Sequence, residues 1–174
     1  MPITKVKDVM LPLERYTNVS EDAALQDVFL ALEGALKGRG KTDPAEARDF
    51  AVLVLDKNKQ VLGRLGVWDV LHGLDPQLQK RVDPLAMVDG YEAWDQPLAH
   101  LASKARHRRA RDLVNALPRH EFIDEEASIN EALRRLLDNR TLSLIAMRGT
   151  RAVGVLRIVD VFQYVCDAVR AELG

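Results

Sequence analysis

The chain has 174 residues, 47% of them hydrophobic and 29% charged, so it is long enough to bury a substantial core. Its 25 basic and 26 acidic residues give a net charge of −1, which offers no overall attraction to nucleic acid or to an anionic membrane. The apolar runs are too short to cross a bilayer, residues 1–5 lack the core of a secretion signal, and the single cysteine, Cys166, excludes an intrachain disulfide, so we expect a cytoplasmic location.

The first part of the chain predicts a strand, a helix, a hairpin and a closing helix. Residues 16–19 are predicted as a short strand, and Ser20 or Asp22 is predicted to cap the helix that follows. Apolar residues then recur on one helical face, namely Leu25, Val28, Phe29, Leu32 and Leu36. Residues 50–55 and 60–65 predict the two strands of a hairpin around a turn at 56–59.

Two segments interrupt this pattern. Residues 33–49 are rich in glycine and include Pro44, so we predict a surface-loop insertion. Within it, residues 38–42 resemble a phosphate-binding loop, but Ala35 stands where the first glycine is required. Residues 76–109 contain three prolines and one glycine that break regular structure, and a helix is predicted over 96–109. This segment is expected to be a linker.

The basic run at residues 104–111 is the sharpest local charge cluster. We interpret it as a solvated helix surface balanced by Glu125 and Glu126. Contact with nucleotide phosphates or with nucleic acid is the alternative, although the run lacks interleaved aromatic residues. Trp68 and Trp94 are expected to be packing or interface residues.

The second part of the chain repeats the first. Residues 6–10 align with residues 110–114 at an offset of 104, which continues to Leu32 over Leu136. From Ala51 over Leu142 the offset is 91, and it pairs Leu53 with Leu144, Gly63 with Gly154 and Asp69 with Asp160. The change of offset gives the first copy 13 extra residues before residue 51. Such a duplication predicts two similar units related by a pseudo-twofold axis, with ligand clefts between them.

In the second copy, Ile129, Ala132, Leu133, Leu136 and Leu137 repeat the apolar face of the first helix. A second hairpin is predicted from strands at 142–147 and 152–156. The closing helix is expected to bury a stripe made of Val161, Phe162, Val165 and Val169.

The ordered set of motifs resembles the cystathionine β-synthase (CBS) domain, which normally occurs in tandem pairs. The matching segments are 6–10, 19–25, 52–56 and 63–69 in the first copy, and 110–114, 123–129, 143–147 and 154–160 in the second. The resemblance covers residues 6–71 and 110–169. It implies an α/β fold of two β-α-β-β-α repeats about a pseudo-twofold axis, with repeat 1 over 1–75, a helical linker over 76–109 and repeat 2 over 110–174.

The same resemblance implies which residues would meet a ligand. The family signature runs glycine, two hydrophobic residues, threonine or serine, two further residues and aspartate; the aspartate holds the ribose hydroxyls. Asp69 and Asp160 match the aspartate, whereas Gly66 and Arg157 replace the hydroxyl residue. The alternative interpretation is that each aspartate stabilises the N-terminus of a helix. A guanidinium at such a position requires a carboxylate or an anion, so Arg157 either pairs with a phosphate or points into solvent.

These observations predict a non-enzymatic, stand-alone regulatory CBS pair. We expect it to bind AMP, ATP or S-adenosylmethionine between the repeats, with no required cofactor and no metal site. The expected ligand-binding residues are Asp160, Arg157, Asp69, Gly66, Leu53 and Leu144, the two leucines lining base pockets. The expected partners are an unidentified protein and a second copy of the chain, in contact through the helices that begin near Asp22, Trp68, Glu126 and Val159. A protein-interaction scaffold that has lost nucleotide binding is the alternative, followed by a nucleic-acid accessory that uses residues 104–111.

Overall fold

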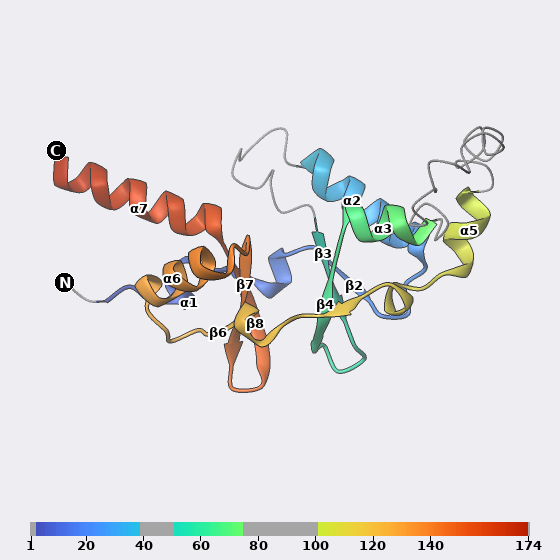
Figure 1. Ribbon diagram of the computed structural model, residues 1–174, viewed down its shortest axis with the longest axis horizontal. Coiled ribbons are helices and arrows are strands. Elements are labelled where there is room, and N and C mark those ends of the chain that lie inside the picture. The colour runs from blue at the N-terminus through green and yellow to red at the C-terminus, as the bar shows by residue number, and fades with distance from the viewer. Residues whose placement is uncertain (1–2, 39–50, 75–100, 174) are drawn as a thin grey trace, which may run out of the picture.

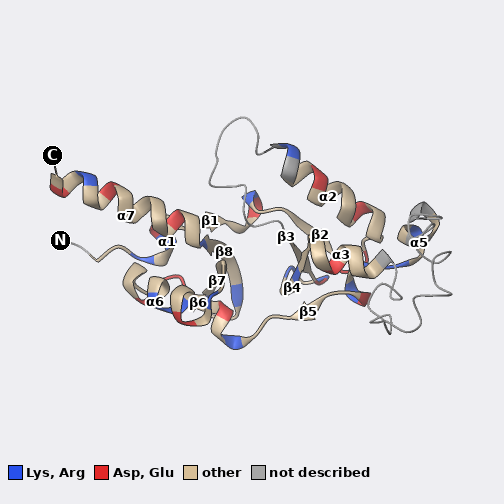
Figure 2. Ribbon diagram, turned by 45° about the horizontal axis from the view of Figure 1, so that its top comes forward, with Lys and Arg blue, Asp and Glu red and all other residues tan. Residues whose placement is uncertain are grey.

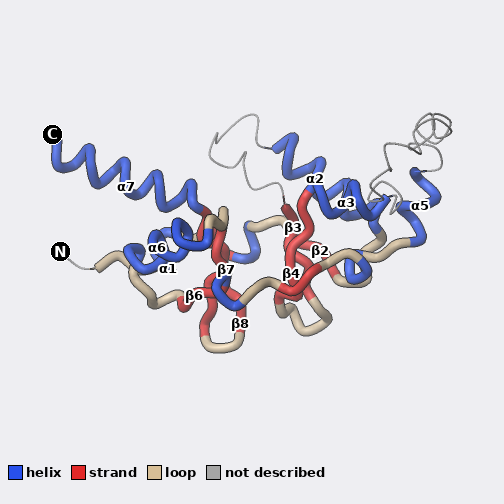
Figure 3. The backbone as a smooth tube through the Cα atoms, in the orientation of Figure 1, coloured by secondary structure: helices blue, strands red, loops and turns tan. Residues whose placement is uncertain are grey.

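The computed structural model describes residues 3–38, 51–74 and 101–173, which form two similar halves side by side (Figure 1). Each half contains a four-stranded sheet, with strand orders β2-β3-β4-β5 and β1-β8-β7-β6. The strands lie at the centre of the molecule and helices flank them on both sides (Figure 3). This is the α/β architecture that the sequence predicts, with β-α-β-β-α in each half.

The first half is built from β2 (Asn18–Ser20), α2 (Leu25–Gly38), β3 (Ala51–Leu55), β4 (Val61–Gly66) and α3 (Val67–Leu74). The second half repeats it with β6 (Phe122–Asp124), α6 (Ile129–Asn139), β7 (Ser143–Arg148), β8 (Arg151–Arg157) and α7 (Ile158–Leu173). In both halves the first strand is parallel to the second and the hairpin is antiparallel. The helix α5 (Leu101–His107) lies in the predicted linker of 76–109, and residues 76–100 of that linker lie outside the described residues.

A short arm precedes each half and joins the sheet of the other half. The first arm, residues 4–12, contains α1 (Val6–Val9) and β1 (Leu11–Pro12), and β1 pairs with β8. The second arm, residues 108–116, contains the 3-10 turn η5 (Ala110–Asp112) and β5 (Asn115–Ala116), and β5 pairs with β4. The two-residue strands β1 and β5 are not predicted by the sequence.

The arms obey the same twofold relation as the repeats. The backbone N–H of Val6 donates to the carbonyl of Ala127 over 2.9 Å, and the N–H of Ala110 donates to the carbonyl of Ala23 over the same distance. In strand pairing, Leu11 faces Val155 as Asn115 faces Arg64. Each of these pairs maps onto the other at the offsets of 104 and 91 residues. The hydrogen bonds of the arms therefore follow the predicted pseudo-twofold symmetry.

Gly63 and Gly154 lie where the arms cross the sheets. A Cβ atom on Gly63 would lie 2.2 Å from the carbonyl oxygen of Asn115, and one on Gly154 would lie 2.7 Å from the carbonyl oxygen of Leu11. Only the absence of a side chain lets β5 and β1 approach so closely. The two glycines thus occupy like surroundings, as the duplication requires.

Three apolar clusters stabilise the fold, one within each half and one between the two sheets. One lies between the first sheet and its helices and includes Leu25, Val28 and Leu65; its counterpart in the second half includes Ile129 and Leu156. The third joins the two sheets through Tyr16, Leu53, Leu55, Ile145, Ala152 and Val155. The arms contribute fully buried residues to the clusters, because Ala110 packs in the first and Val6 in the second.

The structure corrects the alignment of the first hairpin strand. Leu53 faces Arg64 as Ile145 faces Val155, so Leu53 corresponds to Ile145 at an offset of 92 and not to Leu144. The reason is the hairpin turn: five residues separate Leu55 from its partner Val61, and four separate Met147 from Ala152. One of the 13 extra residues therefore belongs to the turn and twelve precede β3.

Three further sequence predictions are wrong in detail. Residues 33–38 of the predicted loop insertion belong to α2, while 39–49 lie outside the described residues. In α7 only Val161 is buried, and Phe162, Val165 and Val169 are 68%, 37% and 48% exposed because they lie away from the contacts of this helix with α1, α6 and β8. The Ser20 hydroxyl accepts a hydrogen bond from the N–H of Asp22 in a turn before α2, rather than capping the helix at Leu25.

Candidate functional site

A cleft opens at the seam between the halves, beside the N-terminus of α3. It has a volume of about 360 Å³. One wall comes from the first half at Ala51, Arg64 and residues 66–68, and the other comes from the second half at Glu121 and residues 139–142. A ligand in this first cleft would therefore touch both repeats at once.

A polar bridge forms the floor of the first cleft. Arg64 on β4 contacts the Glu121 carboxylate at 2.5 Å and donates to the Ser143 hydroxyl over 2.7 Å. All three side chains are largely removed from water, with Ser143 only 1% exposed. The bridge fixes the orientation of the guanidinium and joins β4 to the second half, and it neutralises the charge of Arg64.

The rim of the first cleft carries a second cation. Arg140 ends α6 with a left-handed backbone, at φ 51°, which turns the chain sharply into residues 141 and 142. The Arg140 side chain is exposed and has no carboxylate partner among the described residues. This guanidinium is the one at the cleft that is available to an incoming anion within the described part of the chain.

Asp69 lies directly behind the wall that Gly66 forms. Its Oδ2 accepts a hydrogen bond of 2.7 Å from the backbone N–H of Gly66, and its Oδ1 has no partner in the described ranges. Asp69 itself does not line the cleft, whereas Gly66, Val67 and Trp68 do. The Asp69 carboxylate therefore caps the start of α3.

Trp68 is 77% exposed and lines the first cleft, with its ring 6.1 Å from that of His72. Of the two expected roles, packing or interface, packing within this chain is wrong because Trp68 lies on the outward side of α3, and an interface role stays a prediction. Trp94 lies outside the described residues. The sequence did indicate that Trp68 precedes the signature aspartate, and only the helix orientation shows that its ring borders the cleft.

The equivalent position in the second half, which we call the second position, lies at the start of α7. Here Arg157 replaces Gly66, and its guanidinium holds Asp160 in a two-pronged contact of 2.8 Å to Oδ2 and 2.5 Å to Oδ1. The backbone N–H of Arg157 also donates to Oδ2 over 3.2 Å. Arg157 therefore pairs with its own aspartate and does not point into solvent.

The two leucines predicted to line base pockets lie elsewhere. Leu53 is fully buried in the cluster between the sheets, and Leu144 is fully buried between the second sheet and its helices. They point to opposite faces because successive residues alternate along a strand and the two positions are not equivalent. Neither lines the first cleft. Their part in a base pocket stays a prediction.

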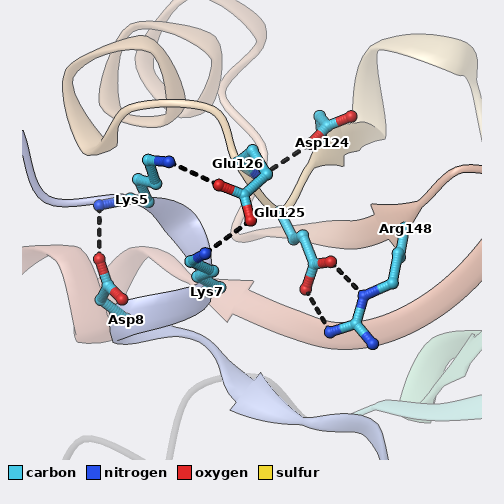
Figure 4. A network of polar contacts seen from close by, with 7 residues as sticks. All are labelled: Lys5, Lys7, Asp8, Asp124, Glu125, Glu126 and Arg148. Atoms are coloured by element: carbon cyan, nitrogen blue, oxygen red, sulfur yellow. Dashed lines mark hydrogen bonds and ion pairs between the residues drawn. The ribbon is translucent and has the colours of Figure 1, made fainter.

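A larger cavity, of about 660 Å³, lies at the opposite end of the seam beside the hairpin turns. Its lining includes Glu14, Lys59, Arg148 and Arg151. Arg148 is tied to Glu125, with an Nη2–Oε2 distance of 2.9 Å (Figure 4). The lining of this larger cavity contains none of the signature residues.

The same figure shows how charge fastens the first arm to the second half. Lys5 and Lys7 both contact the Glu126 carboxylate at 2.6 Å. Hydrogen bonds from Lys5 and Lys7 lower the pKa of Glu126 to about 2, and the Arg148 guanidinium lowers the pKa of Glu125. These contacts show that Glu125 and Glu126 do not balance the 104–111 run, as the sequence suggested.

The basic run instead helps to fasten the second arm to the first half. Arg111 forms an ion pair with Asp22, the counterpart of the pair between Lys7 and Glu126 in the other half. Acidic and basic residues occur together on both halves of the molecule (Figure 2).

In the described ranges, no group of three or more His, Cys, Asp or Glu side chains is arranged to hold a metal ion. Among the helices whose residues are described, none is both long and apolar enough to cross a bilayer.

Comparison with solved structures identifies the fold. CBSX2, a CBS-pair protein from Arabidopsis thaliana, aligns in its complex with AMP at a TM-score of 0.60 and 19% identity, over 94% of this chain and 97% of that one. A putative acetoin utilization protein, AcuB, from Vibrio cholerae aligns at 0.63 and 14%, over 98% and 96%. The CBS domain of a bacterial CNNM/CorC family Mg²⁺ transporter, in complex with ATP, aligns at 0.60 and 14%, over 94% and 87%. The chain has the fold of a tandem CBS domain pair. No family model and no curated relative matches the sequence.

Proposed function

We propose that this chain is a non-catalytic regulatory module that binds an adenosine nucleotide in the first cleft. The observation that carries the proposal is the pairing of two features: a cleft with one wall from each repeat, and an aspartate behind one wall whose Oδ1 has no partner among the described residues. Solved CBS pairs of the same fold include complexes with AMP and with ATP, which supports this class of ligand.

Each group at the first cleft has a role that fits such a ligand. The Oδ1 of Asp69, which has no partner within the described ranges, would accept hydrogen bonds from ribose hydroxyls, and the missing side chain of Gly66 would leave room for the sugar. Arg140 supplies the positive charge for a phosphate. Trp68 offers an aromatic face to the base. Because Arg64 is already neutralised by Glu121, the cleft favours a ligand with few charges, such as a monophosphate.

Binding would act on the arrangement of the two repeats. A ligand that contacts α3 on one side and residues 139–142 on the other favours the relative position in which both contacts are made. The affected surface would be offered to a protein partner. Apolar side chains are exposed on α3 and α7, with Leu71 at 45% and Phe162 at 68%, and we propose that they form the interface of a homodimer.

Isothermal titration calorimetry with AMP, ATP and S-adenosylmethionine tests the proposal. Asp69→Asn weakens the hydrogen bonds to ribose, so we expect a loss of affinity of about tenfold to a hundredfold, since bonds to a charged acceptor contribute on the order of 1.5–3 kcal/mol. Asp27→Asn is the matched control, because Asp27 is exposed in the first turn of α2 and away from the cleft. Absence of heat for every ligand would contradict the proposal.

A protein-interaction scaffold without nucleotide binding is the second candidate. The observation that favours it is the absence of a hydroxyl side chain at both signature positions, Gly66 and Arg157. A protein that shows no heat with any nucleotide, yet self-associates in analytical ultracentrifugation, would support this candidate.

A further inference from the structure

We infer that the Arg157 side chain itself fills the second position and blocks ligand binding there. The chain therefore binds nucleotide at one of its two symmetry-related positions and not at both. This inference rests on the proposed function, because it concerns the same ligand. It starts from the two local backbones, which are alike: Ala51 faces Gly66 at the end of one hairpin, as Ser143 faces Arg157 at the end of the other.

The two aspartates differ in what they already bind. Within the described part of the chain, Asp69 accepts one hydrogen bond, from the backbone N–H of Gly66. Asp160 accepts one from the backbone of Arg157 and two more from its guanidinium, so both of its oxygens are engaged. A ligand hydroxyl that approached Asp160 would have to displace a charged donor.

Burial makes this displacement costly. The side chains of Arg157 and Asp160 are only 8% and 16% exposed. Neutral hydroxyl donors form weaker bonds to a carboxylate than a guanidinium does, and a guanidinium that loses its carboxylate inside the protein is left with an uncompensated charge. The same ligand should therefore bind at least about a hundredfold more weakly at the second position than at the first cleft.

The facing wall shows the same asymmetry. The counterparts of Arg64, Glu121 and Ser143 at the second position are Val155, Thr17 and Ala51, which lack any charge. The first cleft thus has a charged bridge across the seam and an available aspartate, whereas the second position has neither. The duplicated unit has specialised one copy for binding and the other for structure.

Exchange of the two residues tests this inference. Arg157→Gly copies the residue that the first repeat uses, and Gly66→Arg installs the same ion pair beside the first cleft. We expect calorimetry with AMP to give one site per chain for the wild type, a second site for Arg157→Gly, and at least about a hundredfold weaker binding for Gly66→Arg. Arg134→Ala, at an exposed position on α6, is the control and should leave one site.

Each outcome decides between the claims. Two sites in the wild type, an unchanged single site in folded Arg157→Gly, or weaker binding in that variant would overturn the inference, the last because Arg157 would then be a phosphate ligand. If Arg157→Gly does not fold, Arg157→Thr repeats the measurement and Gly66→Arg decides independently. Binding by Arg157→Gly alone would refute the proposed function and would support only the part of the inference that Arg157 blocks the second position. Absence of binding in the wild type and in every variant would refute both.

Discussion

Replacing Gly63 with alanine tests the crossing of the arms directly. The added Cβ would lie 2.2 Å from the carbonyl oxygen of Asn115 and 2.6 Å from Cγ2 of Val114, far inside ordinary contact distance. The nearest obstacle is backbone, so β5 itself must move, and β5 is bound to β4 at only two paired positions. Overpacking of this kind costs about 1–3 kcal/mol, and we expect Gly63→Ala near the upper end.

Urea unfolding followed by circular dichroism measures this cost. For a chain of this size, a loss of about 2–3 kcal/mol lowers the melting temperature by roughly 4–12 °C. Gly34→Ala is the matched control: Gly34 lies inside α2 with nothing within 4 Å of an added Cβ, so alanine should stabilise the helix by about 0.5–1 kcal/mol. Gly154→Ala should cost less than Gly63→Ala, because one of its obstacles is the flexible sulfur of Met10. A stability for Gly63→Ala equal to the wild type would refute the crossing described here.

Two further predictions concern the arms and the core. The ion pairs of Glu126 with Lys5 and Lys7 lower its pKa from 4.5 to about 2, so their stabilisation is present above pH 4.5 and lost as pH falls towards 2; in urea unfolding, Glu126→Gln should be less stable than the wild type at pH 7 and equal to it near pH 2, and a constant difference would contradict this. Leu144→Ala should lose about 2–5 kcal/mol because Leu144 is fully buried, whereas Leu142→Ala, at a half-exposed position, should change stability by less than about 1 kcal/mol; equal losses would show that Leu144 is not in the core.

The repeat was predictable because its signal is local and occurs twice. Apolar positions such as Leu25 and Ile129, or Leu32 and Leu136, match at a fixed offset, and each turned out to be buried. The placement of Asp69 and Asp160 at the starts of equivalent helices was predictable for the same reason. Arg157 was predicted to need a carboxylate or an anion, and the structure supplies the carboxylate of Asp160.

What the sequence could not predict involves partners far apart in the chain. Strands β1 and β5 are two residues long and pair across more than a hundred and about fifty residues, respectively, so no local periodicity marks them. The bridge from Arg64 to Glu121 and Ser143 joins the two halves, and each residue alone resembles an ordinary polar surface residue. The misplacement of Leu53 by one residue followed from a single insertion in a turn, which fixed-offset comparison cannot locate.

The exchanged arms limit what kinds of motion can carry a signal. Separating the two repeats would strip an outer strand from each sheet and withdraw Val6 and Ala110 from cores that they complete. The pairing of both arms therefore opposes a hinge that swings the halves apart. The motion that the arms permit most readily is a small sliding or rotation about the seam, comparable to shear between packed layers. We therefore expect any regulatory signal to be transmitted by displacements of that size.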